Sequence, residues 1–521
     1  MTQPSYDLLT EPWIPVLHAD GIADALGLRD ALLQAHQLRS LSGETPLVTA
    51  SLYRLLLAVL YRALEVLTPD AWEDLWEQGH FPEAALISYL ERWSERFDLF
   101  HPERPFLQWP DERARPKSVI NLVPHMASGN NATLFDHHHE GQDVALAPDE
   151  AARALLVALT FGLAGLSGLP QKFTDAPWAR GIVFLAEGET LFETLMFNYL
   201  PARHISLGFG NVEADRPFWE AEDPFAPDRS IPLGITDYLT WPNRAVRLLP
   251  EPDGKGRWMV RQVTLAPGLF LEPGVWDPYK HYREDEKRGR LVLRFQEGRA
   301  LWRDSAVLLQ VRGGEQHPPK PLAWLADLVA ADVLPHHARY RFMALGMANN
   351  QAKIDFYREE HFPLPAEYLA DANLVQRLAE ALELAEKTAS RALGKALNRL
   401  ATLILAPTGD DPEGRKPDRK DIDNLTGHWA GRRAYWAALE VPFWEMLTAL
   451  PQQGETALET WRETVRRTAR EAFARVAESL GETPRVLKAV ARAEQQFLGA
   501  LFCVFHPQEE KCKAKKKSKR R

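Results

Sequence analysis

The sequence predicts an α+β protein with a large mixed N-terminal domain and a C-terminal antiparallel four-helix bundle. At 521 residues the chain exceeds what one hydrophobic core usually serves, so more than one domain is expected. Residues 257–312 alternate between apolar and polar side chains as short β-strands do, whereas residues 367–405 carry leucines on one helical stripe. We therefore place the mixed domain at residues 1–364, the bundle at 365–506 and a basic, disordered tail at 507–521.

Composition limits the location and the chemistry of the protein. We find no run of about 18 apolar residues, which argues against a membrane span, and the N-terminus lacks the basic and apolar regions of a secretory signal. Cys503 and Cys512 are the two cysteines, too few for a disulfide framework or a cysteine-built zinc site. We therefore expect a cytoplasmic protein without a membrane partner.

The net charge limits how the chain could contact nucleic acid. Lys and Arg number 62 against 71 Asp and Glu, a formal net charge of −9. A protein that coats nucleic acid over its whole surface is usually basic. Any contact with DNA must therefore be local, as in a subunit of an assembly that brings its own RNA.

The elements of the first domain follow from periodicity and turn residues. A short strand is expected at 6–16, where Trp13 is a candidate core residue, and the turn at 253–256 suits a β-hairpin. Further strands are expected at 258–265, 290–295, 306–311 and 339–345. Helices are expected at 27–35, 47–67, 70–78, 82–97, 148–159, 190–200 and 321–331.

The bundle is predicted from helices at 367–405, 427–451, 453–480 and 484–505, with a longer loop after the first. Two rows of cations lie along its helices: Arg391, Lys395 and Arg399 on the first, and Arg462, Arg466 and Arg470 on the third. The first row and Arg470 have no acidic residue three or four positions away. For these residues a track for phosphates and a plain solvated surface are both open.

The segment 341–358 combines an apolar approach with three consecutive side-chain amides. Gly346 permits a positive φ or a close backbone approach, and Asn349, Asn350 and Gln351 follow in what we expect to be a loop. Amides donate and accept hydrogen bonds without charge, so they can read base edges while nearby Lys353 and Arg358 hold a phosphate backbone. A polar turn or a helix start is the alternative.

Residues 136–140, Asp-His-His-His-Glu, are all potential metal ligands, so a metal-dependent hydrolase using Asp136 and His137–His139 is one hypothesis. Adjacent side chains point in different directions, however, and metal-site motifs normally separate their ligands by two to four residues. A loop that contacts RNA or a neighbouring subunit is favoured, and no metal is expected.

Gly162, Gly165 and Gly168 are regularly spaced after a predicted helix. Such glycines let a backbone approach a sugar-phosphate strand or a minor groove, and close helix packing explains them equally well. Lys172 follows and could hold a phosphate. A P-loop is excluded because neither the preceding strand nor Gly-Lys-Ser/Thr is present.

Several of these stretches resemble one family. Residues 346–352 are similar to the Gly-x-x-x-Asn-Gln-Ala loop of the large subunit (CasA) of the type I-E CRISPR Cascade surveillance complex. The N-terminal Trp13-Ile-Pro-Val, the segments 102–108 and 237–249, and the helix 428–444 resemble the same family in the same order. Some relatives hold zinc shortly after the segment 237–249, but this chain has no cysteine there, so neither zinc nor another cofactor is expected.

The resemblance implies a non-catalytic subunit of an antiviral, RNA-guided complex. Its partners would be the other Cascade subunits, the guide RNA, target double-stranded DNA and a helicase-nuclease recruited after R-loop formation. In that family a glutamine wedge opens DNA beside the PAM, and the resemblance implies this role for Gln351. A purely architectural helical scaffold remains a third hypothesis.

The family's contacts map onto three groups of residues. PAM and DNA binding would fall to Asn349, Asn350, Gln351, Lys353, Gly162, Gly165, Gly168 and Lys172. Guide RNA or subunit contact would fall to Asn130, Asn131, Phe135, as a stacking residue, and His137. Displaced-strand binding would fall to Arg391, Lys395, Arg399, Arg466 and Arg470. The family's PAM-contacting lysine has no settled counterpart, and Lys280 is one candidate.

Overall fold

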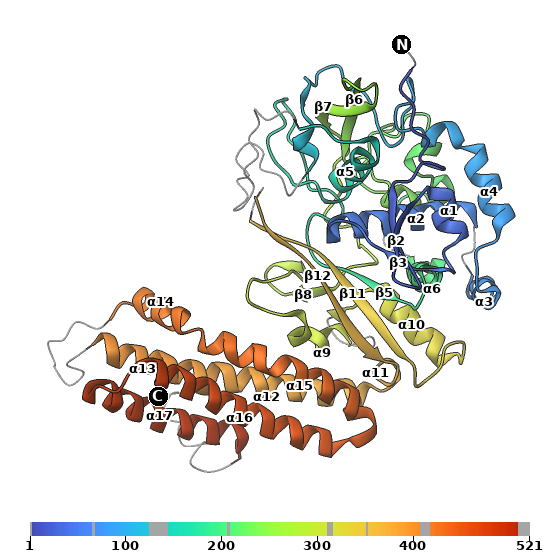
Figure 1. Ribbon diagram of the computed structural model, residues 1–521. Coiled ribbons are helices and arrows are strands. Elements are labelled where there is room, and N and C mark those ends of the chain that lie inside the picture. The colour runs from blue at the N-terminus through green and yellow to red at the C-terminus, as the bar shows by residue number, and fades with distance from the viewer. Residues whose placement is uncertain are drawn as a thin grey trace. The chain divides into compact units, whose positions relative to one another are not determined.

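The computed structural model describes residues 3–64, 68–123, 144–205, 209–309, 316–350, 353–406 and 417–508. The chain divides into two compact units (Figure 1). The first comprises Met1–Leu301 and Val311–Leu369, and the second comprises Trp302–Gln310 and Ala370–Arg521.

The first unit mixes helices with short strands. Its helices are α1 (Leu28–Leu33), α2 (Pro46–Ala63), α3 (Pro69–Gln78), α4 (Glu83–Arg92), α5 (Pro148–Phe161), α6 (Leu191–Asn198), α7 (Ala202–Ile205), α8 (Ile235–Leu239), α10 (Lys320–Ala330) and α11 (Glu367–Ala370). Short 3-10 helices are η1 (Ser94–Phe97), η2 (Val119–Leu122), η3 (Val212–Ala214) and η4 (Phe218–Glu220), whereas η5 (Leu301–Asp304) lies in the second unit from Trp302 onward. The helices predicted for this part of the sequence are present, with ends that differ by a few residues.

Helix α2 is the central helix of this unit. Thr45 caps its N-terminus by accepting a hydrogen bond from the Val48 backbone N–H (3.3 Å), and Pro46 occupies the first turn. Within the described residues, α2 has the length and apolar composition to cross a membrane, but 83% of that window is buried inside the protein. Burial on nearly every side is the behaviour of a core helix.

The strands of the first unit form four three-stranded antiparallel sheets within the described residues. The strands, in sheet order, are β2 (Ala23–Leu26), β1 (Ile14–His18) and β3 (Leu38–Leu41); β4 (Lys117–Ser118), β7 (Trp258–Pro267) and β6 (Arg244–Pro252); β10 (Gln316–His317), β8 (Tyr282–Asp285) and β9 (Gly289–Val292); and β12 (Lys353–Pro365), β11 (Arg339–Asn350) and β5 (Val183–Glu187).

Two sequence expectations for this unit are confirmed. Trp13 is fully buried and its indole N–H donates to the Leu8 carbonyl (2.8 Å). The turn at 253–256 joins β6 to β7, and Gly256 adopts a φ of +78°, which a side chain would disfavour.

The strand predicted at 306–311 is wrong over 306–308, and residues 310 and 311 lie outside the described residues. Residues Ser305–Leu308 form helix α9, and Leu308 and Leu309 are both buried although they are adjacent in sequence. A short apolar run does not distinguish a strand from a buried helical turn by periodicity alone.

The second unit is helical. Besides α9 it contains α12 (Ala372–Lys387), the π-helical η6 (Thr388–Leu393), α13 (Gly394–Leu405), α14 (Arg419–Trp429), α15 (Gly431–Gln453), α16 (Glu455–Ser479) and α17 (Pro484–Phe505). Gly454 alone separates α15 from α16, which pack along each other, and α13 packs on α17. Tyr435, Leu439, Val465 and Ala493 are fully buried in the core of this unit.

The structure divides two helices that the sequence predicted as continuous. Asp371 interrupts the helix expected at 367–405, because its side chain accepts from the Asn373 backbone N–H (2.8 Å) and caps α12. Ala430, at a φ of +52°, separates α14 from α15 inside the helix expected at 427–451. The helix expected at 484–505 is α17.

The second unit also takes in residues 302–309, which the sequence assigned to the N-terminal domain. Trp302 stacks on Phe443, with ring centroids 4.6 Å apart. Arg303 lies 3.7 Å from the centre of the Trp436 ring and pairs with Glu386 at 2.6 Å. These aromatic and ionic contacts hold the segment against α12 and α15.

Candidate nucleic-acid interface

Strands β11 and β12 form a long antiparallel ribbon that carries the amide segment at its end. The register pairs Arg339 with Pro365 and Asn350 with Lys353. Strand β5 pairs only with residues 341–345 of β11, so the ribbon continues beyond its sheet (Figure 1). The loop expected at 346–351 is therefore wrong over 346–350, which are in β11. Gln351 lies outside the described residues.

Gly346 stands where the ribbon leaves the sheet, directly after the last residue paired with β5. Its φ is +155°, and a Cβ added there would lie 3.1 Å from the carbonyl oxygen of Gly181. Both properties expected of this glycine, a positive φ and a close backbone approach, are confirmed. The glycine lets the ribbon pass close to Gly181.

Among the three amides, the side chain of Asn349 is the one that the structure describes. A β-bulge between Ala348 and Asn349 precedes the pairing of Asn349 with Ile354, and bulges re-aim side chains at strand ends. The Asn349 Nδ2 is buried without a hydrogen-bond partner among the described residues. The end of the ribbon therefore keeps an unused amide donor.

Positive charge at the ribbon end is concentrated on Lys353. Its side chain is exposed, and Lys353 is the first residue of β12, paired with Asn350 at the end of β11. Arg358, the second expected cation, is engaged internally: it contacts Glu360 at 3.1 Å and lies 4.8 Å from the centre of the Phe356 ring. Lys353 is thus better placed than Arg358 to meet a phosphate.

The glycines at 162–168 have different structural roles. Gly162 ends α5, and a Cβ there would collide with the guanidinium of Arg244 and the carbonyl of Ala158. Arg244 is buried, which lowers its pKa to about 10, and it donates to the Leu163 carbonyl (2.7 Å). Gly162 is therefore required for internal packing, the second of the two roles the sequence left open for these glycines.

The rest of this glycine segment forms an exposed turn. Gly165 exchanges backbone hydrogen bonds with Phe173 (3.2 and 3.0 Å), and Gly168 has a φ of +84°. Leu166, between them, is 86% exposed, and Lys172 is exposed just before Phe173. Gly165, Gly168 and Lys172 thus lie on one accessible turn that a ligand backbone could approach.

Lys280 is not available for DNA. Its side chain is 6% exposed, and its ammonium donates to the Pro177 carbonyl at 2.6 Å and lies 3.5 Å from Asp277. Burial lowers the pKa of Lys280, and the Asp277 carboxylate opposes that shift. This lysine holds the interior of the first unit together.

The two rows of cations in the second unit differ in exposure and in ion pairing. Arg391, Lys395 and Arg399 are exposed and make no ion pair with another described residue. Arg470 is exposed in the same way, whereas Arg466 pairs with Glu463 at 3.6 Å and lies 5.0 Å from the Phe505 ring centre. The row on η6 and α13 is therefore the better candidate for a phosphate track.

The remaining candidates lie outside the described residues. These are Asn130, Asn131, Phe135 and His137, together with the alternative metal ligands Asp136, His138 and His139. Within the part of the chain that the structure describes, no group of three or more His, Cys, Asp or Glu side chains could hold a metal ion.

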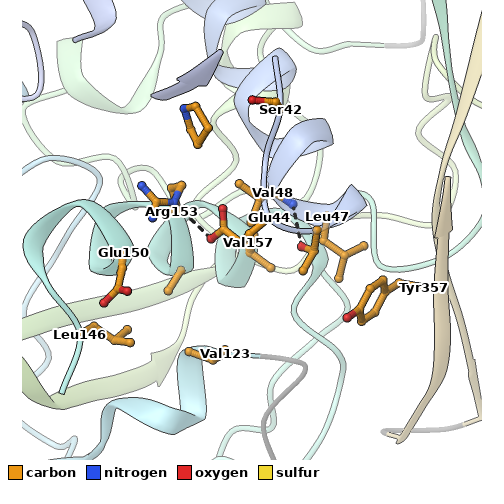
Figure 2. A pocket seen from close by; sticks show the side chains of 13 residues that line it. Ser42, Glu44, Leu47, Val48, Val123, Leu146, Glu150, Arg153, Val157 and Tyr357 are labelled. Carbon is orange, nitrogen blue, oxygen red and sulfur yellow. Dashed lines mark hydrogen bonds and ion pairs between the residues drawn. The ribbon is translucent and has the colours of Figure 1, made fainter. Parts of the chain in front are cut away.

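Sequence analysis missed Tyr357, a residue of the same ribbon. Tyr357 is 38% exposed and lines a cavity of about 430 Å³ (Figure 2). Alternating exposure along β12 places it on the face opposite Phe356 and Arg358. Reading 353–365 as a strand would have revealed this face.

Comparison with known proteins gives a consistent result over nearly the whole chain. The family model described as CRISPR-associated protein Cse1 matches residues 7–472. CasA/Cse1 of Thermus thermophilus is 37% identical over 514 residues, which cover 94% of this chain and 96% of the relative.

Solved structures agree with this match. Cse1 from Acidimicrobium ferrooxidans superposes with a TM-score of 0.78 at 25% identity, covering 97% of this chain and 99% of that one. A chain of a CRISPR RNA-guided surveillance complex superposes with a TM-score of 0.72 at 26% identity, covering 95% of this chain and all of that one (100%).

The mixed fold and these matches define a CRISPR-associated protein. The chain belongs to the Cse1 family, also named CasA, so the resemblance drawn from the sequence is confirmed.

Proposed function

We propose that this chain is the large, non-catalytic subunit of a cytoplasmic type I-E Cascade complex, where it recognises the PAM and starts strand separation. The observation that carries the proposal is the β11–β12 ribbon, which extends past its sheet with Asn349, Asn350 and Lys353 at its end. Uncharged amides at such an end can enter a groove and test base edges, and Lys353 can hold a phosphate. Gln351, by its place in the sequence between Asn350 and Lys353, would wedge between the first base pairs.

The exposed turn with Gly165, Gly168 and Lys172 supports a second contact with the PAM duplex. Glycine exposes backbone N–H groups that can approach phosphates without a side chain in between. The minor groove offers a degenerate pattern of donors and acceptors, which would allow several PAM sequences. Gly162 contributes by packing rather than by contact.

The second unit would hold the displaced strand. Its long helical segments, α12 with α13, α15, α16 and α17, would be the four members of the proposed antiparallel bundle. Arg391, Lys395 and Arg399 would bind phosphates of the single strand, with Arg466 and Arg470 as weaker or additional contacts. The helicase-nuclease would be recruited once the R-loop has formed.

Assembly with the other Cascade subunits would supply the affinity for DNA that this acidic chain lacks by itself. One solved relative is a chain of an RNA-guided surveillance complex, and we infer that this chain likewise binds the other Cascade subunits and the guide RNA. Asn130, Asn131, Phe135 and His137 are proposed for that contact. Guide pairing then reads the target sequence while this subunit reads the PAM.

The test is binding of the reconstituted complex, with and without this chain, to duplexes that carry a PAM or a scrambled PAM. The proposal requires that the preference for the PAM duplex appears only when this chain is present. An equal preference without the chain would leave it as an architectural scaffold.

The hydrolase hypothesis predicts a different result from metal analysis of the purified protein. A stoichiometric transition metal that is retained by the wild type and lost on changing His137, His138 and His139 to Ala would favour the enzyme. The proposed function expects no such metal.

A further inference from the structure

A groove in the first unit lies beside the ribbon that carries the amides. Its volume is about 430 Å³, and Figure 2 shows α5 on one side, the start of α2 above it and Tyr357 of β12 at one end. Its lining residues come from segments far apart in sequence. They are Pro15, Ser42, Glu44, Thr45, Leu47, Val48, Val123, Leu146, Glu150, Arg153, Ala154, Val157 and Tyr357.

The floor of the groove is apolar. Leu47, Val48 and Val157 are buried there, and the half-exposed Tyr357 ring is directed toward them (Figure 2). A volume of this size could hold one or two apolar side chains of a partner, and exposed aromatic residues beside apolar grooves often mark protein interfaces.

The rim of the groove is acidic. Glu44 and Glu150 line it, and the one guanidinium in the lining, that of Arg153, is already paired with Glu44 and with the neighbouring Asp149. Arg153 pairs with Glu44 and with Asp149, both at 3.1 Å, and donates to the Trp13 carbonyl at 3.0 Å.

The pKa of Tyr6, which interacts electrostatically with Asp149 and Arg153, responds to these charges. The pKa of Tyr6 is raised to about 12, first by burial and then by the carboxylates of Asp149 and Glu11, against the opposing effect of Arg153. Among the described lining residues, the carboxylates of Glu44 and Glu150 against the one guanidinium of Arg153 leave a net negative charge, to which the neighbouring Asp149 adds. Phosphates of DNA or RNA would be repelled here, whereas a cationic partner would be attracted.

We propose that this groove docks a segment of a neighbouring protein subunit, which presents an apolar anchor side chain flanked by lysine or arginine. The apolar floor fits the anchor and the carboxylates of the rim complement the cations. The partner's membership of the Cascade complex rests on the proposed function, but the chemistry of the segment rests on the groove. The ribbon then divides two surfaces, with DNA at its end and protein at the face of Tyr357.

The test measures binding of this chain to the remaining Cascade subunits assembled on their guide RNA. Ala154→Trp fills the groove from α5, where Ala154 is only half-buried, and Tyr357→Ser removes the exposed ring. Each should weaken binding by about tenfold or more, as loss of an anchor contact does at protein interfaces. Thermal unfolding of each variant checks that the fold is retained.

Charge reversal tests the rim. Glu44→Lys, at a 46% exposed side chain, should weaken binding and reduce its dependence on salt. Glu103→Lys changes an exposed acidic residue away from the groove by the same charge and is the matched control. Unchanged binding in Ala154→Trp, Tyr357→Ser and Glu44→Lys would overturn the proposal.

Other occupants give different results. If Ala154→Trp assembles normally but loses DNA binding, nucleic acid occupies the groove. If the free chain dimerises and Ala154→Trp abolishes the dimer, a second copy occupies it. Either result overturns the proposal, whereas failure of the wild-type chain to bind the other subunits at all would instead overturn the proposed function.

Discussion

His361 of β12 reaches across β11 to Glu187 of β5. Its Nδ1 lies 2.9 Å from a Glu187 carboxylate oxygen, and its Nε2 lies 2.7 Å from Glu359. These two carboxylates raise the pKa of His361 from 6.5 to about 9, against the opposing effect of burial. The protonated imidazole thus ties the outer strand of the sheet to the strand on its far side.

This pair of contacts makes part of the stability dependent on pH. Because the pKa is raised in the folded protein, the stabilisation is fully present below about 6.5 and is lost as the pH rises through about 9. We expect His361→Gln to lower the free energy of unfolding by about 1 kcal/mol at pH 6.5, since solvent screens a half-exposed ion pair. Denaturant unfolding should show the two proteins converging near pH 10. A constant difference at both pH values would contradict this role.

Gly346→Val should destabilise the ribbon where it leaves the sheet. The backbone there has a φ of +155° and passes close to the Gly181 carbonyl, so a β-branched side chain would force a shift costing about 1–3 kcal/mol. Gly254→Val, at a turn glycine with nothing within 4 Å of an added Cβ, is the control. Chemical denaturation should separate the two variants, and equal stabilities would exclude a local constraint at Gly346.

Gly162→Ala separates a packing role from a ligand-binding role. The added methyl group would displace the buried Arg244, so we expect a loss of about 1–3 kcal/mol in stability. DNA binding by the fraction that remains folded should be unchanged. Normal stability combined with weakened binding to the PAM duplex would instead assign Gly162 to the DNA contact.

Gln351→Ala tests the wedge. With the glycine segment intact, R-loop formation should fall by about tenfold or more, because a side chain that intrudes between base pairs helps to open them. Stability should barely change, because the paired strands end at Asn350 and begin again at Lys353, so Gln351 belongs to neither strand. R-loop formation can be followed by footprinting of the displaced strand with permanganate. A parallel loss of stability and R-loop formation would contradict the assignment.

The triple variant Arg391→Ala, Lys395→Ala and Arg399→Ala should weaken retention of the displaced strand. If all three residues contact phosphates, the plot of log K for single-strand binding against the log of the salt concentration should become less steep. Its slope should fall in magnitude by about 2, since each contact to a single strand contributes about 0.7. The control removes Arg377, Arg462 and Arg467, which pair with Glu455 and Glu471. If binding by the two variants depends equally on salt concentration, Arg391, Lys395 and Arg399 make no phosphate contacts.

Much of the candidate site could be predicted from local sequence. Gly346 and the amides after it were identified from residue type alone, because a left-handed or crowded backbone needs glycine and paired amides are unusual. Their placement on a ribbon was missed, since Pro363 and Pro365 suggested a break. Both prolines are in β12 at the edge of its sheet, where no neighbouring strand needs their missing N–H.

The sequence by itself determined most of the long helical stretches of the second unit, the core position of Trp13 and the family. These features depend on residue spacings of a few positions and on short motifs, which can be recognised directly in the sequence. The tertiary structure decided that Arg303 packs with Glu386, that His361 meets Glu187 and that Gly162 is held under Arg244. Each of these contacts joins residues about 80 to 170 positions apart, and side-chain packing over such separations leaves no periodic trace in the chain.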